Sequence, residues 1–334
     1  GGVRGGVEST GHPRKGETSW QESLLVGVFA ADPVTSYRFA AAAAKLARVT
    51  ADTETSLSRA YADAAGRAWR WADAAEGFGE SEKVADQRNL AAVELYWLTG
   101  DEAYHRAFKQ TTRLGSPDAA HIKQQHAIFT YARLPQALAD AELRRAASRV
   151  TVHLADTAID FAAGNAFALA SSEPDLPVMG WLGYYTTPGI ISRALPRAHY
   201  LTGDDRYLAA TVASTDYAAG ANPDNLVMTT GLGHNPVRNP LHIDSRRSGQ
   251  PAPAGITVYG PSDPAARFDF DGWVHQWFLG KSMVPDSRDW PTAEMYADIY
   301  LWPSTNEYTV HQTMGPTSYT WGYLAAASRT PAAD

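Results

Sequence analysis

A stretch that occurs twice sets the architecture of this chain: Tyr96-Trp-Leu-Thr-Gly-Asp-Glu-Ala-Tyr104 and Tyr200-Leu-Thr-Gly-Asp-Asp-Arg-Tyr207. In each copy Gly ends one helix, the next Asp caps a second helix, and a Tyr three residues later starts its buried face. Two such hairpins favour an all-α fold, an (α/α)6 barrel or toroid in which inner and outer helices alternate. A linear solenoid is the competing architecture, but its repeats have a period of about 20–50 residues, and these copies lie much farther apart.

Helical patterns also fill most of the remaining sequence. The segment from Tyr37 to Arg48 is rich in Ala, and Asp32-Pro33 precedes it as a start signal. Ser116-Pro117-Asp118 predicts another start, with Ser as the cap and Pro at the first helical position. Further helices are predicted at 56–76, 81–99, 101–112, 117–134, 136–163, 188–202, 204–220, 264–278, 291–300 and 316–328.

Composition narrows the classes of protein and partner. The chain has 334 residues and 44% hydrophobic content, enough for a large core. No run approaches the roughly 20 apolar residues that span a bilayer, and no export signal is visible, so we predict no membrane partner. A net charge of −7 disfavours nucleic acid as a ligand. The absence of Cys excludes disulfides and thiolate catalysis, and it suits a secreted, extracellular protein.

Function is expected in the irregular stretches 171–188, 222–264 and 302–314, because loops on a rigid scaffold carry most catalytic groups. Aromatic residues make up 11% of the chain, and their rings present apolar faces that suit the C–H faces of sugars. One interpretation is a carbohydrate-binding trough beside acidic groups. The other is that most rings belong to the core. The candidate substrate-binding rings are Trp181, Tyr185 and Trp302.

One carboxylate stands out in the segment Trp302-Pro-Ser-Thr-Asn-Glu307-Tyr308. No Lys or Arg lies between Arg288 and Arg329 to neutralise Glu307. Apolar neighbours raise the pKa of a carboxyl towards the range that suits a proton donor. An exposed loop Glu without a role is the ordinary alternative.

A family resemblance becomes strong after Asp216. Asp216-Tyr-Ala-Ala-Gly-Ala-Asn-Pro223, Val227-Met-Thr-Thr-Gly-Leu-Gly-His-Asn-Pro236 and Asn239-Pro-Leu-His242 resemble, in order and spacing, consecutive motifs of glycoside hydrolase family 9. Asn306-Glu307 resembles the Asn-Glu signature of that family. The resemblance implies an inverting hydrolase in which Glu307 is the general acid and His242, with nearby Tyr and Trp, holds the sugar.

The sequence departs from that family at three places, one of which is Ser304-Thr305, where the family often has Asp-Tyr. The family's His-His-Arg is Leu241-His242-Ile243 here, so we expect Asp244 or Arg246 to supply the lost polar contacts. The Asp-x-Gly-Asp motif of the family's catalytic base is absent. We therefore expect residues 1–334 to be the C-terminal portion of one catalytic domain, incomplete without N-terminal helices on a cleaved segment or another chain. The segments Asn239-Pro-Leu-His-Ile-Asp-Ser-Arg246 and Met314-Gly-Pro-Thr-Ser-Tyr-Thr-Trp-Gly-Tyr323 resemble the family's subgroup with an N-terminal immunoglobulin-like module.

The default substrate implied by the resemblance is a β-1,4-linked glucan, as for an endoglucanase or cellulase. The runner-up is an exo-acting β-glucosaminidase on chitosan oligosaccharides, for which Asp244 would receive the amine. A non-catalytic carbohydrate-binding fragment stays open because the base is absent. A polysaccharide lyase also stays open, although the acidic balance of the chain speaks against it.

Metal chemistry is weakly indicated. Neither His-x-x-x-His nor His-Glu-x-x-His occurs, so we predict no catalytic metal and no required cofactor. Asp and Asn residues between Asp216 and Asp224 are candidates for a structural calcium ion. The same residues commonly cap turns, and both interpretations stay open.

Overall fold

The structure, a computed structural model, describes residues 2–9, 14, 16–75, 81–170, 193–261, 272–273, 275–286, 289–291 and 294–328. These residues form two compact units, one from Gly1–Arg14 with Ser23–Thr151 and the other from Lys15–Glu22 with Val152–Asp334. Each unit has its own packing and is described by itself.

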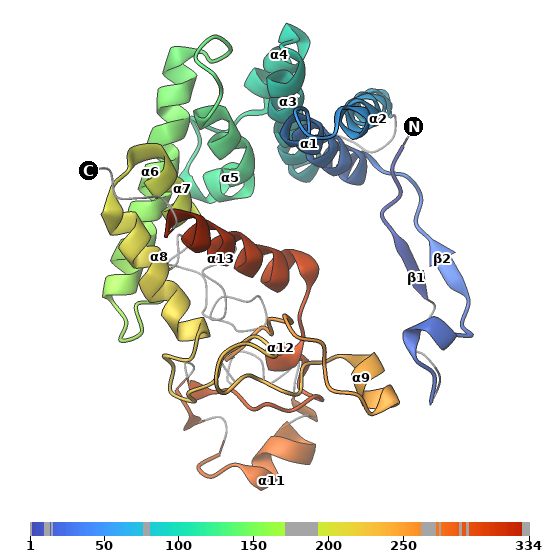
Figure 1. Ribbon diagram of the computed structural model, residues 1–334, viewed down its shortest axis with the longest axis vertical. Coiled ribbons are helices and arrows are strands. Elements are labelled where there is room, and N and C mark those ends of the chain that lie inside the picture. The colour runs from blue at the N-terminus through green and yellow to red at the C-terminus, as the bar shows by residue number, and fades with distance from the viewer. Residues whose placement is uncertain are drawn as a thin grey trace. The chain divides into compact units, whose positions relative to one another are not determined.

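The first unit is a succession of helices preceded by a short hairpin (Figure 1). The hairpin pairs β1 (Val7–Ser9) with β2 (Val26–Val28) in antiparallel register, and the sequence analysis did not predict it. The helices are α1 (Pro33–Val49), α2 (Thr55–Asp73), α3 (Glu82–Thr99), α4 (Glu102–Thr111), α5 (Asp118–Ala132) and the first half of α6 (Ala141–Ala163).

Small side chains let α1 approach its neighbours closely. Ala40, Ala44 and Ala47 share one face of the helix and are fully buried, and α1 packs on both α2 and α3. Trp69 of α2 meets the rings of Tyr37 and Tyr104 edge to face, at centroid distances of 5.1 and 5.2 Å. Trp69 is thus a core residue, as the second interpretation of the aromatic residues predicted.

Both repeated connectors have the predicted geometry. Gly100 and Gly203 end α3 and α7 (Ala194–Thr202) in the left-handed region, with φ of 70° and 69°. The carboxylate of Asp101 accepts a hydrogen bond from the Ala103 N–H at 2.8 Å, which caps α4. The carboxylate of Asp204 accepts one from the Arg206 N–H at 3.0 Å, which caps α8 (Asp205–Ala218). The helix-hairpin prediction is confirmed at both places.

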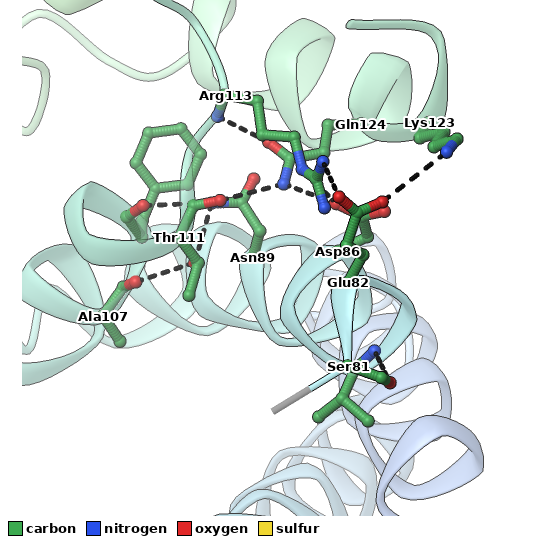
Figure 2. Close-up of polar contacts among 11 residues, drawn as sticks. Ser81, Glu82, Asp86, Asn89, Ala107, Thr111, Arg113, Lys123 and Gln124 are labelled. Carbon is green, nitrogen blue, oxygen red and sulfur yellow. Dashed lines mark hydrogen bonds and ion pairs between the residues drawn. The ribbon is translucent and has the colours of Figure 1, made fainter. Parts of the chain in front are cut away.

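A buried polar cluster joins α3 and α5 through the connector that follows α4 (Figure 2). The Asp86 carboxylate, 7% exposed, lies 2.9 Å from the Arg113 Nε and accepts a 2.8 Å hydrogen bond from the Gln124 amide. The Gln124 amide oxygen in turn accepts the backbone N–H of Arg113 at 2.9 Å. Because Asp86 is both paired and hydrogen-bonded, its charge is tolerated inside the unit.

The second unit combines helices with a long irregular segment (Figure 1). Its main helices are the second half of α6, α7, α8 and α13 (Gly315–Ala327), which is entered through a π-helical turn, η6 (Val310–Met314). The shorter elements are η1 (Ser19–Gln21), α9 (Ile243–Ser248), η3 (His275–Leu279), α11 (Gly280–Ser282) and α12 (Pro303–Asn306). Within the described ranges, no helix of either unit is long and apolar enough to cross a membrane.

Two small cores hold the irregular segment together. Met228, Val237, Val258 and Tyr296 form one, and Leu279, Met295 and Trp302 form the other. Each draws on residues that are distant in sequence but belong to the same unit. The loops that carry the family motifs are therefore fixed by apolar packing rather than by regular secondary structure.

The helix predicted at 291–300 is wrong for its described part, because residues 295–299 are extended or irregular. The polar groups of this segment bond to other loops: Asp298 accepts backbone N–H groups of Arg238 and Asn239, and the Ala297 carbonyl accepts the Asn306 amide. These cross-loop contacts replace the bonds within a helix.

Two helix starts also differ from the prediction. Pro117 occupies the cap position of α5, one residue before the position predicted for it. Helix α6 begins at Ala141 instead of residue 136, because the Asp140 carboxylate accepts the backbone N–H groups of Glu142 and Leu143. The predicted helix residues 188–192 and 264–271 lie outside the described residues.

Candidate active site

Glu307 stands at the end of the short helix α12. Its backbone N–H donates to the Pro303 carbonyl at 3.0 Å, so it is the residue at which the helix stops. The preceding Ser304, Thr305 and Asn306 are completely buried, whereas the Glu307 side chain is half-buried. The local fold therefore anchors the three residues before the carboxylate and brings the carboxylate itself to the surface of the unit.

Asn306 ties this helix to two other segments. Its amide oxygen accepts a 2.6 Å hydrogen bond from the Tyr296 hydroxyl, and its amide nitrogen donates to the Ala297 carbonyl at 2.7 Å. Its backbone carbonyl accepts the Leu241 N–H at 2.7 Å. The Asn-Glu and Asn-Pro-Leu-His motifs, far apart in sequence, are thereby joined by a direct backbone hydrogen bond.

The backbone of Glu307 is held from another side by the segment around Tyr259. The Tyr259 N–H donates to the Glu307 carbonyl at 2.9 Å, and the Gly260 N–H donates to the Thr305 carbonyl at 2.9 Å. The Tyr259 hydroxyl donates to the Gln312 side chain at 2.7 Å, which fixes the ring of Tyr259. The segments around Leu241, Tyr259 and Ala297 thus hold the backbone at and just before Glu307.

Burial governs the electrostatics here. Desolvation raises the pKa of the Glu307 carboxyl above its ordinary value, as the sequence predicted. Burial, and then the charge of Glu307, raise the pKa of the Tyr259 phenol. Among the described residues no Lys, Arg or His forms an ion pair with Glu307. A half-buried carboxyl without a cationic partner can hold its proton to a higher pH than a surface carboxyl, as a general acid must.

His242 caps α9 and lies next to the Glu307 segment. Its Nδ1 accepts the Ser245 N–H at 3.2 Å, which leaves the proton of the neutral ring on Nε2. Its ring stacks on Tyr308 at a centroid distance of 6.3 Å and an angle of 27°. His242 therefore offers an N–H donor close to the residue that follows Glu307.

The sequence model of glycosyl hydrolase family 9 matches residues 30–315, which is most of the chain. The chain belongs to glycosyl hydrolase family 9. The Asn-Glu and Asn-Pro-Leu-His motifs that the structure brings together both lie inside the matched range.

Endoglucanase C of Cellulomonas fimi is 29% identical to this family 9 chain over 248 residues, or 72% of the chain. A metagenome-derived family 9 endoglucanase is 24% identical, with a TM-score of 0.77 over 98% of the chain. A mutant thermostable endoglucanase from Alicyclobacillus acidocaldarius is 22% identical, with a TM-score of 0.77 over 98% of the chain. This likeness confirms the predicted all-α, (α/α)6 fold.

The family 9 chain is shorter than each of these relatives. It spans 21% of the Cellulomonas endoglucanase, 57% of the metagenome-derived structure and 61% of the Alicyclobacillus structure. The predictions that it is the C-terminal portion of one domain, and that it belongs to the subgroup with an immunoglobulin-like module, stay predictions.

The other predicted site residues have separate surroundings. Asp244 accepts hydrogen bonds from the backbone N–H and the hydroxyl of Ser19, at 2.6 and 2.5 Å, and these bonds lower its pKa. Arg246 is exposed, and its guanidinium lies 4.8 Å from the centre of the Tyr300 ring. Arg246 and His242 both line a cavity of about 300 Å³.

Trp302 does not serve the role predicted for it. Its side chain is 2% exposed and packs with Leu279 and Met295, so its ring belongs to a core and has no free face for a sugar. The sequence around Trp302 was ambiguous, because a Trp that precedes a Pro-initiated helix can lie either in a core or on a binding surface. Trp181 and Tyr185 lie outside the described residues.

The sequence analysis missed several residues that support this site. Tyr296 orients Asn306, Asp298 accepts two backbone N–H groups next to His242's loop, and Ser19 binds Asp244. Tyr296 and Asp298 lie in the segment predicted as a helix at 291–300, so their contacts with distant loops were not expected. Tyr259 lies in the stretch 222–264, where function was expected, but nothing in its spacing indicated the hydrogen bond to Glu307.

The turn-capping interpretation of 216–224 holds for Asn222. Its amide oxygen accepts the N–H groups of Asp224 and Leu226 at 3.2 Å each, and its amide nitrogen donates to the Tyr217 carbonyl. Within the described part of the chain, no three His, Asp or Glu side chains gather closely enough to hold a metal ion. A structural calcium ion stays a prediction.

Proposed function

We propose that this protein is a cellulase-type glycoside hydrolase that cleaves β-1,4-linked glucan with inversion, with Glu307 as the general acid. Membership of family 9 supports the reaction class. The observation that carries the assignment of Glu307 is its place: a half-buried carboxyl of raised pKa without an ion pair among the described residues, on a backbone held by Tyr259.

In an inverting reaction, a protonated carboxyl and a carboxylate lie on opposite faces of the sugar, about 6.5–9.5 Å apart. Glu307 gives its proton to the glycosidic oxygen as the bond to the anomeric carbon breaks. A water molecule attacks from the other face and loses a proton to the base. His242 holds the sugar through the N–H at Nε2, which its hydrogen bond from Ser245 leaves available.

We assign the base to polypeptide outside this chain. The sequence lacks the base motif that the resemblance leads us to expect, and the chain spans 57–61% of the two solved relatives described above. The same reasoning leads us to propose an N-terminal segment as the partner that carries the base. The proposed protein acts outside the cell, where polymeric glucan is met.

The geometry favours glucan over glucosamine. The runner-up function needs a carboxylate for the amine, and the carboxylate of Asp244 already accepts two hydrogen bonds from Ser19. A free carboxylate at that position would have supported the runner-up.

The test is Glu307→Gln in the full natural polypeptide, assayed on a soluble β-1,4-glucan. Loss of the proton donor should lower kcat by about 10²–10⁴-fold, while binding of cello-oligosaccharides is retained. Glu294→Gln, which changes a carboxyl of the same unit away from Glu307's contacts, serves as the control. Full activity of Glu307→Gln would remove Glu307 from the mechanism. Binding without cleavage by the unaltered protein would favour a non-catalytic carbohydrate-binding role.

A further inference from the structure

The cavity beside α9 has an unusual charge for this chain. Its volume is about 300 Å³, and its lining includes Arg238, Asn239, His242, Arg246 and Gln250 but no Asp or Glu among the described residues. The chain as a whole carries a net charge of −7. A cavity lined by two arginines is thus a local reversal of the overall charge.

Neither arginine has a carboxylate partner among the described residues. Other described arginines form ion pairs, such as Arg206 with Asp156 at 2.8 Å, but within the described ranges neither Arg238 nor Arg246 does. Two arginines that line one hollow without such a pair favour an anion there.

Two carboxylates close in the fold are engaged by other donors. Asp298 accepts the backbone N–H groups of Arg238 and Asn239 at 2.8 and 2.9 Å, and the side-chain amide of Asn239 at 3.3 Å. Asp244, on the same short helix as Arg246, accepts the N–H and hydroxyl of Ser19. Neither carboxylate forms an ion pair with Arg238 or Arg246 among the described residues.

The cavity is also connected to the proposed proton donor. Its lining residue His242 stacks on Tyr308, which follows Glu307, and the adjacent Leu241 N–H binds the Asn306 carbonyl at 2.7 Å. Arg246 is held against the face of Tyr300, so its charge is fixed in direction. The cavity lining and the segment that carries Glu307 are therefore in direct contact.

We propose that this cavity binds the carboxylate of an acidic sugar, so that the substrate is a β-1,4-linked glycan in which some units are uronosyl residues. A guanidinium group matches a carboxylate in charge and in the spacing of its donors, and Gln250 offers an amide to the hydroxyls. A neutral glucan has no negative charge to match two guanidinium groups, and an amino sugar would be repelled. The inference rests on the proposed hydrolase function and specifies its substrate.

The experiment measures binding by calorimetry in the full natural polypeptide carrying Glu307→Gln, so that the ligand is not consumed. The probes are cellotetraose and the same oligosaccharide oxidised to carboxylate at C6. The carboxylated probe should bind about 10-fold more tightly, and added salt should weaken only its binding. Arg238→Gln should remove most of this preference without changing the affinity for cellotetraose, and Arg246→Gln should weaken the binding of the carboxylated probe more than that of cellotetraose.

Two further variants separate charge from folding. Arg247→Gln makes the same change on α9 at a residue outside the cavity lining, and it should leave the preference intact. Arg246→Lys keeps the charge and should retain most of the preference. Equal binding of both probes by the unaltered cavity, or the same loss in Arg247→Gln as in Arg246→Gln, would overturn the inference.

The outcome also distinguishes this inference from the function on which it rests. Cleavage of neutral glucan together with equal binding of the probes overturns the acidic-sugar site and leaves the hydrolase. Preference for the carboxylated probe without hydrolysis of either probe by the polypeptide with Glu307 supports the cavity and overturns the hydrolase. Unsaturated products from the carboxylated probe would instead identify a lyase and overturn the proposed hydrolase function.

Discussion

The Tyr296 hydroxyl donates a 2.6 Å hydrogen bond to the amide oxygen of Asn306, the residue immediately before the proposed proton donor. Asn306 is completely buried, and Tyr296 is 5% exposed. The side-chain amide of a residue adjacent to Glu307 is thus oriented from inside the core, by a residue that does not reach the substrate.

Tyr296→Phe should destabilise the protein and impair catalysis together. The change leaves the buried amide oxygen of Asn306 without its donor, at a cost of about 1–3 kcal/mol. Chemical denaturation measures the first effect, and kcat on soluble glucan at a temperature where the variant is folded measures the second. Tyr319→Phe, at a ring that is 38% exposed, is the matched control. An unchanged unfolding midpoint would show that the hydrogen bond contributes nothing.

The activity should extend to a higher pH than an ordinary Glu allows. A general acid must be protonated, so kcat/KM falls as pH rises through the pKa of Glu307 in the free protein. Burial raises that pKa above the ordinary 4.5, which moves the alkaline limb of the profile above pH 4.5. A pH–rate profile on soluble glucan measures the limb. A limb at or below 4.5 would contradict the role assigned to Glu307.

Asp224→Asn should stabilise the protein at neutral pH. Burial, and then the charge of Glu294, raise the pKa of Asp224 from 3.8 to about 6 in the folded protein. The folded protein therefore binds this proton more tightly than the unfolded chain does, and its ionisation removes stability as pH rises from about 4 through about 6. The gain in free energy of unfolding should be roughly 1–2 kcal/mol at pH 7 and near zero below pH 4.

Thermal melts of Asp224→Asn at a series of pH values test this dependence. Glu294→Gln should give a smaller gain with the same pH trend, because it removes only the second cause of the shift. An equal gain at pH 4 and pH 7 would mean that ionisation of Asp224 is not its source.

Gly203→Ala and Gly322→Ala should have opposite effects on stability. Gly203 ends α7 with φ of 69°, where a Cβ costs about 1 kcal/mol. Gly322 lies inside α13, and a Cβ there would meet no atom within 4 Å, so Ala should stabilise by about 0.5–1 kcal/mol. Urea unfolding of the two variants measures the difference, and a shift of the same sign in both would contradict the explanation.

The helices and their connectors were largely predictable, because the signals for them are local. Gly100 and Asp101 carry in adjacent positions everything that ends one helix and starts the next. The same holds for Gly203 and Asp204. The raised pKa of Glu307 was predictable for a related reason, since the sequence around it has no Lys or Arg and holds aromatic and small polar residues.

The contacts around Glu307 were not predictable, because they join segments that are far apart in sequence. The bonds from Leu241 to Asn306 and from Tyr259 to Glu307 depend on how the loops fold together. Trp302 is a second example. The sequence places it close to Glu307, but the packing of its ring against Met295 depends on a contact that the local sequence does not encode. The extended course of 295–299 also comes from distant hydrogen bonds that no helical pattern encodes.

The grip on the segment before Glu307 has a consequence for how this protein can change over evolution. Ser304, Thr305 and Asn306 tolerate little substitution because they are completely enclosed, whereas Arg238 and Arg246 stand at the surface. If the proposed cavity selects the glycan, substitutions at Arg238 or Arg246 can change which glycan binds while the enclosed segment before Glu307 stays the same. Substrate preference and the position of the proton donor can then evolve separately.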